Sequence, residues 1–236
     1  MDAYLKEFHR ELKGYEGSLI KVSSAKRMNR NAKEYLAKLV RKGAVERAAW
    51  GWYYIKPRKS ADLLGFLRQD RNFKAIIGQS AASFWNHDFV HRESLSVIVD
   101  SLSFRKALES FAKKKGWEIA VDYSKNPRKS GFARIKGLSI ERPGISIIEC
   151  MKKWAFVDAV AVLASWKDRI DWKRLARDSY WSRISGTGVR VRQAIEYVAS
   201  MLKIKAKNFR PRKTRIKDSF VRQELDEAVE KVMEFE

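Results

Sequence analysis

The sequence predicts an α+β fold, in which a small helix-and-hairpin unit precedes a mixed α+β domain and a helical tail. Three observations favour this fold class. Apolar residues recur at helical spacing over residues 32–40, and the following residues 52–55 are rich in strand formers. Short apolar runs typical of strands recur between residues 75 and 150. From residue 155 onward the apolar period is helical again, which places strands before helices in the second part.

Residues 23–56 contain the most informative pattern, a short helix, a turn, a longer helix and a two-stranded ribbon. The apolar stripe of the longer helix consists of Ala32, Leu36, Leu39 and Val40. Gly43 lies where a helix ends in the left-handed conformation. Val45 then begins a strand, and residues 48–51 form a turn into the second strand. This order predicts a winged helix-turn-helix over residues 1–58, which offers its second helix to the DNA major groove.

The flanking segments complete this unit. Tyr4, Leu5, Phe8 and Leu12 predict a first helix that ends near Gly14. Residues 19–22 are a short β-like run that adds a third strand to the ribbon, and Ser23 or Ser24 is expected to cap the next helix. Residues 56–60 then break the pattern and predict a domain boundary.

The basic face of the second helix predicts the DNA contacts. Phosphates would be bound by Lys and Arg, while Asn31 with Arg30 or Lys33 would contact base edges. Two alternatives remain, a basic face that is only solvated and an Asn31 that caps the helix. The predicted DNA-binding residues are Lys26, Arg27, Arg30, Asn31, Lys33, Lys38, Arg41, Trp50, Trp52, Lys56, Arg58, Arg210, Arg212 and Lys213.

Residues 61–202 form the predicted α+β domain. The predicted strands are residues 75–77, 95–99, 117–123, 132–135, 138–140 and 145–150. A helix that begins near Phe104 is expected to end near Gly116. Residues 155–164 are apolar nearly all round, which predicts a buried central helix. Asp171 is expected to cap a helix over residues 172–180, and a further amphipathic helix follows Thr187.

The tail, residues 203–236, divides by charge. Residues 203–217 hold eight Lys and Arg and no acid, which favours an arm along DNA phosphates over a solvated linker. Residues 218–236 hold seven acids against Arg222 and Lys231, and their apolar spacing predicts a helix. Both segments are expected to lie outside the two predicted cores.

The net charge of the chain is +22, from 50 Lys and Arg against 28 Asp and Glu in 236 residues. A balance this one-sided indicates a polyanionic partner, because a thermophile's charge-rich surface raises Glu together with Lys. No run reaches the ~18 apolar residues of a membrane span and no secretory leader opens the chain, so we expect a cytoplasmic protein without membrane contact. The single cysteine, Cys150, excludes an intrachain disulfide and is expected to be buried and inert.

No motif in the chain predicts an enzyme, a metal site or a cofactor. His87, Asp88 and His91 are close together, but a metal site needs a third strong ligand and ordered supporting contacts. Residues 125–131 lack the spacing of a nucleotide-binding loop. Residues 77–81 resemble the start of a nucleotidyltransferase domain, yet the following apolar strand lacks the paired acids that would hold magnesium.

Several segments in this order resemble the AbiEi-type antitoxins, transcriptional regulators from toxin–antitoxin and phage-defence operons. They are LVRKGAVERAAWGWYYI, IIGQSAASFWNHDFV, AFVDA and VRVRQAIEYVASML, within residues 18–202. The resemblance implies an N-terminal winged helix that represses its own operon, and a C-terminal domain that counters a nucleotidyltransferase toxin. It places the basic helix at the DNA and Trp50-Gly51-Trp52 on the wing.

We therefore expect a DNA-binding regulator of the antitoxin and autorepressor kind, with no catalytic activity. Its partners would be double-stranded DNA and a nucleotidyltransferase-type toxin. Two alternatives stay open, a nucleic-acid-processing enzyme with a degenerate nucleotidyltransferase-like domain and a protein that neutralises a toxin without binding DNA. The sequence predicts neither the operator nor the oligomeric state.

Overall fold

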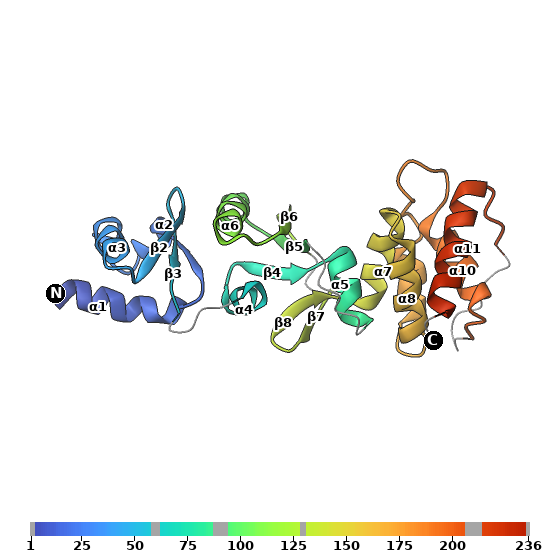
Figure 1. Ribbon diagram of the computed structural model, residues 1–236, viewed down its shortest axis with the longest axis horizontal. Coiled ribbons are helices and arrows are strands. Elements are labelled where there is room, and N and C mark those ends of the chain that lie inside the picture. Colours follow the sequence, from blue (N-terminus) through green and yellow to red (C-terminus); the bar gives the residue numbers. More distant parts are fainter. Residues whose placement is uncertain (1–2, 58–61, 87–93, 128–130, 206–213, 235–236) are drawn as a thin grey trace. The chain divides into compact units, whose positions relative to one another are not determined.

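The computed structural model describes residues 3–57, 62–86, 94–127, 131–205 and 214–234 (Figure 1). Within these ranges the fold is mixed α+β, as the sequence predicts. Contacts divide the chain into two units, and the predicted boundary at residues 56–60 lies inside the first of them. The first unit comprises residues 1–75, 93–128 and 134–139, and the second comprises residues 76–92, 129–133 and 140–236.

The N-terminal part of the first unit consists of helices and one small antiparallel sheet with strand order β1-β3-β2. Its elements are α1 (Ala3–Leu12), η1 (Lys13–Tyr15), β1 (Leu19–Lys21), α2 (Val22–Ala25), α3 (Ala32–Arg41), β2 (Val45–Ala49) and β3 (Trp52–Ile55). The predicted third strand is therefore present. The predicted serine cap is wrong, because Ser23 and Ser24 lie inside α2 and its N-cap residue, Lys21, makes no side-chain capping bond.

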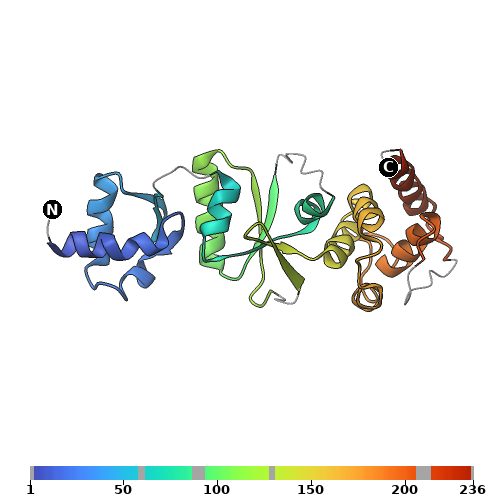
Figure 2. The ribbon, with the colours of Figure 1, turned by 90° about the horizontal axis from the view of Figure 1, so that it is seen from below.

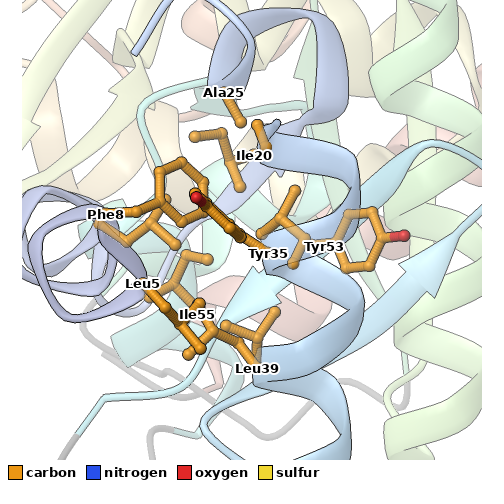
Figure 3. Close-up of a cluster of buried hydrophobic side chains, with 12 residues drawn as sticks. Leu5, Phe8, Ile20, Ala25, Tyr35, Leu39, Tyr53 and Ile55 are labelled. Carbon is orange, nitrogen blue, oxygen red and sulfur yellow. The ribbon is translucent and has the colours of Figure 1, made fainter. Parts of the chain in front are cut away.

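One apolar cluster holds these elements together (Figure 3). Leu5 and Phe8 of α1 meet Tyr35 and Leu39 of α3, and the rings of Phe8 and Tyr35 lie 5.6 Å apart at a tilted angle. Ile55 of β3 closes the cluster from the sheet side. Helix α3 buries one side, formed by Ala32, Tyr35, Leu36 and Leu39, and its opposite face is therefore left to solvent.

The remainder of the first unit is built from α4 (Leu63–Gln69), β5 (Leu95–Val99), α6 (Leu102–Lys115) and β6 (Ile119–Tyr123). Strand β5 pairs in parallel with β6. They belong to a five-stranded sheet of order β6-β5-β4-β8-β7, completed by β4 (Phe73–Ile76), β7 (Phe132–Ile135) and β8 (Leu138–Glu141). The predicted end of α6 is confirmed, since Gly116 has a φ of 68° and follows the last helical residue.

The hairpin is joined to the rest of the first unit by aromatic contacts. The ring of Tyr54 in β3 lies 4.7 Å from that of Phe111 in α6 and 5.9 Å from that of Phe66 in α4. The backbone N–H of Leu19 donates to buried Asp70 at 2.7 Å, which ties β1 to the segment after α4. These contacts connect residues 1–57 to the residues that follow them in the first unit.

The second unit is mainly helical (Figure 2). Its helices are α5 (Gly78–Trp85), α7 (Pro143–Lys152), α8 (Phe156–Trp166), α9 (Trp172–Asp178), α10 (Val191–Met201) and α11 (Ser219–Met233). Helix α8 buries residues on most sides, which confirms the predicted central helix. The Asp171 cap is also confirmed, because its Oδ1 accepts the backbone N–H of Arg174 at 3.0 Å.

Two predictions fail in this unit. Residues 145–150 are not a strand but the middle of α7, in which Pro143 occupies the first turn and Cys150 is buried. The tail does not lie outside the core, because α11 buries one apolar side from Val221 to Val232. None of the described helices is long and apolar enough to cross a membrane.

Candidate nucleic-acid interface

The exposed face of α3 carries a line of small and basic side chains. Lys33, Ala37 and Arg41 follow one another at intervals of four residues, and all three are exposed. Neighbours at this spacing lie on one side of a helix, about 6 Å apart. Beside them, Lys38 forms an ion pair with Glu34, with 2.7 Å between Nζ and Oε1. The acid on this face is thus neutralised by its neighbour, and Lys33 and Arg41 leave the face positive.

The turn between α2 and α3 extends this positive surface. Lys26, Arg27 and Arg30 are all exposed, and so is Asn31 at the N-cap position of α3. The side chain of Asn31 makes no capping hydrogen bond. Instead, its backbone N–H donates to Oδ1 of Asn29 at 2.8 Å. The alternative in which the side chain of Asn31 caps α3 is therefore not supported.

The tip of the β2–β3 hairpin presents one aromatic side chain and one cation. Trp50 is 89% exposed, and the guanidinium of Arg47 lies 5.2 Å from its ring centroid. The turn is formed by Trp50 and Gly51, and Gly51 has a φ of 72°, a conformation that suits glycine. The carbonyl of Gly51 accepts the N–H of Val22 at 2.9 Å, which fixes the tip beside the start of α2.

Trp52 does not share the exposure of Trp50. Only 6% of its surface is accessible, and its ring packs 5.6 Å from that of Phe104. The hairpin is held from this side, where Ser110 donates to the carbonyl of Ala48 at 3.2 Å and Lys115 pairs with Glu46 at 2.6 Å. Trp52 thus supports the hairpin from inside and is not available to a ligand, contrary to its place among the predicted DNA contacts.

The remaining predicted residues divide into two groups. Lys56, just after β3, is exposed. Arg58 and the tail residues Arg210, Arg212 and Lys213 lie outside the described residues, as do His87, Asp88 and His91. Arg47 and Lys42, both exposed, were missed by the sequence prediction. Lys42 directly follows the basic helix and Arg47 lies in the first strand of the hairpin, and these positions were the signal that could have found them.

The second unit contains a cavity of about 260 Å³, open on one side. Trp85 and Trp166 form an edge-to-face pair in its wall, with ring centroids 4.9 Å apart. Two carboxylates, Asp171 and Asp178, also line it. Asp171 caps α9, and Asp178 pairs with Arg177 at 3.0 Å. Both carboxylates of the cavity wall thus make contacts within α9.

No metal-binding group of three or more His, Cys, Asp and Glu occurs among the described residues. Comparisons with protein-family models, with curated proteins and with solved structures find no match to this chain.

Proposed function

We propose that residues 1–56 act as a winged helix-turn-helix and that the protein is a DNA-binding transcriptional regulator. The element order α1-β1-α2-α3-β2-β3, with β3 between the other two strands, supports this proposal. The observation that carries it is the exposed face of α3, on which Lys33 and Arg41 lie opposite the buried stripe. In this proposal α3 enters the major groove, and Trp50 with Arg47 lies against the adjacent backbone.

Salt dependence tests this proposal most directly. Seven exposed cations surround the proposed interface, namely Lys26, Arg27, Arg30, Lys33, Arg41, Arg47 and Lys56. Each neutralised phosphate contributes about −0.9 to the slope of log K against log salt, so we expect a slope of about −6 if all of them contact DNA. The measurement is fluorescence anisotropy with a duplex from upstream of the gene. An affinity that is flat between low and moderate salt would contradict the proposal.

Asn31 is proposed to contact a base edge, and its variant separates recognition from stability. Because the side chain makes no capping bond, Asn31→Ala should change the free energy of unfolding by less than about 0.5 kcal/mol. It should relax discrimination at one base position by about 1–3 kcal/mol, measured with a panel of single-substituted duplexes. Asn29→Ala is the matched control, since it removes a bond to the helix start and should cost about 1 kcal/mol of stability. If Asn31→Ala discriminates between the duplexes as well as the unaltered chain does, Asn31 does not contact a base edge and other residues do.

The antitoxin role is a further part of the proposal and rests on the resemblance together with one feature of the second unit. Phe220 is 59% exposed, although its ring lies only 5.7 Å from that of Trp154. Val157, three residues after Trp154 in the chain, is also exposed. Contiguous apolar patches on a protein surface are common where a protein partner binds. Co-expression with the product of the adjacent gene tests the antitoxin role. If that product is a toxin, this protein should restore the growth of the cells and the two proteins should co-purify.

A further inference from the structure

The loop between α9 and α10 is held in one conformation by hydrogen bonds at both of its sides. The N–H of Ile184 donates to the carbonyl of Val189 at 3.0 Å, and both side chains are buried. The N–H of Ser185 donates to the carbonyl of Lys152, and the indole Nε1 of Trp154 donates back to the carbonyl of Ser185 at 2.9 Å. The loop is therefore a fixed platform on the second unit.

This platform exposes two adjacent aromatic rings. Trp181 is 82% exposed and Tyr180 is 39% exposed. The two rings meet edge to face, with centroids 4.7 Å apart. Leaving an indole in water gains no hydrophobic stabilisation for the fold, so core packing does not account for the position of Trp181.

Arginines surround the two rings. The guanidinium groups of Arg190 and Arg192 lie 5.5 and 5.7 Å from the ring centroid of Tyr180, and Arg183 is exposed on the strand-like pair with Arg190. Arg192 also donates its Nε to Glu196 at 2.9 Å, but a guanidinium has further donors for a second anion. Residues 179–195 contain no Asp or Glu. The surface thus combines exposed ring faces with positive charge.

We propose that this aromatic–arginine surface, formed by Tyr180, Trp181, Arg183, Arg190 and Arg192, binds single-stranded nucleic acid. A base would stack on Trp181, while the guanidinium groups bind the neighbouring phosphates. A duplex cannot use the surface in this way, because its bases are already stacked and only their edges are accessible. RNA and single-stranded DNA share the required chemistry. The proposal concerns the second unit and does not depend on duplex binding by α3.

The test uses the full chain and labelled single strands of roughly 15 nucleotides, oligo(U) and oligo(dT), in fluorescence anisotropy. Trp181→Ala should weaken binding of at least one of them by about tenfold, the effect of removing one stacked base. Trp181→Phe should retain most of the affinity, because the smaller ring still stacks. Tyr4→Ala, which removes an exposed aromatic side chain from α1, should leave it unchanged. Duplex affinity should be the same in Trp181→Ala and the unaltered chain.

Two results would overturn the proposal. The first is that the unaltered chain binds neither oligo(U) nor oligo(dT), or that the Trp181→Ala variant binds these strands as tightly as the unaltered chain. The second is that polyglutamate displaces the bound strand completely, and that Trp181→Ala weakens the binding of polyglutamate as much as it weakens the binding of the strand. This result would make the surface a site for acidic polypeptides. The preference between oligo(U) and oligo(dT) then assigns the site to RNA or to single-stranded DNA. Circular dichroism of each variant shows whether α9 and α10 remain folded.

Discussion

Replacing Arg30, Lys33 and Arg41 together by Ala should lower the affinity for duplex DNA by about 500-fold at ~0.1 M salt, since each lost phosphate contact costs roughly eightfold there. The slope of log K against log salt should become shallower by about 2.7, which is the loss of three contacts. All three side chains are exposed, so the free energy of unfolding should change by less than about 0.5 kcal/mol for each. Anisotropy titrations at several salt concentrations give both quantities.

The matched control removes the same charge from other surfaces. Lys6 of α1, Lys13 of η1 and Lys106 of α6 are exposed, and changing them to Ala also lowers the net charge by three. If attraction by the total charge explained binding, both triple variants would lose affinity equally. Equal losses would therefore contradict an interface on α3, while a loss confined to the first variant supports it.

Much of the fold followed from apolar periodicity. Strand β5 lies where the run Leu95–Val99 predicts it, and α8 is buried as its nearly uniform apolar sequence predicts. Residues 145–150 show the limit of this method. A short apolar run rich in Ile fits a strand as well as a buried helix, and Pro143-Gly144 suits a turn or the first turn of a helix. Only the contacts of α7 with other helices decide between them.

The candidate interface was predictable in part for the same reason. The exposed side of α3 follows from the stripe that Leu36 and Leu39 bury. The burial of Trp52 did not follow, because it requires α6, which lies about fifty residues further along the chain, to cover the hairpin. The tail shows the same dependence on distant contacts. Residues 218–236 were expected to lie outside both cores, whereas the apolar side of α11 joins the second unit's core.

The stability of the second unit should depend on pH through Glu141. This side chain is buried, and Oε2 accepts the backbone N–H of Gly78 at 2.8 Å. Burial raises the pKa of Glu141 from 4.5 to about 7, against the lowering effect of that hydrogen bond. Because the folded state holds the proton more tightly than the unfolded state, the stabilisation is complete below pH 4.5 and is lost as the pH rises to 7.

Glu141→Gln should therefore remove a pH-dependent change of about 3 kcal/mol in the free energy of unfolding, the equivalent of this pKa shift. The amide is neutral at every pH, and its oxygen can still accept the N–H of Gly78. The variant should be more stable than the unaltered chain at pH 8, and the two should converge near pH 4.5. Urea denaturation at several pH values measures the difference, and Glu227→Gln, at an exposed position of α11 where the side chain contacts Gln223, is the control. Parallel stability curves for Glu141→Gln and the unaltered chain would show that the carboxyl is solvated, because a group with the same pKa in both states contributes no slope.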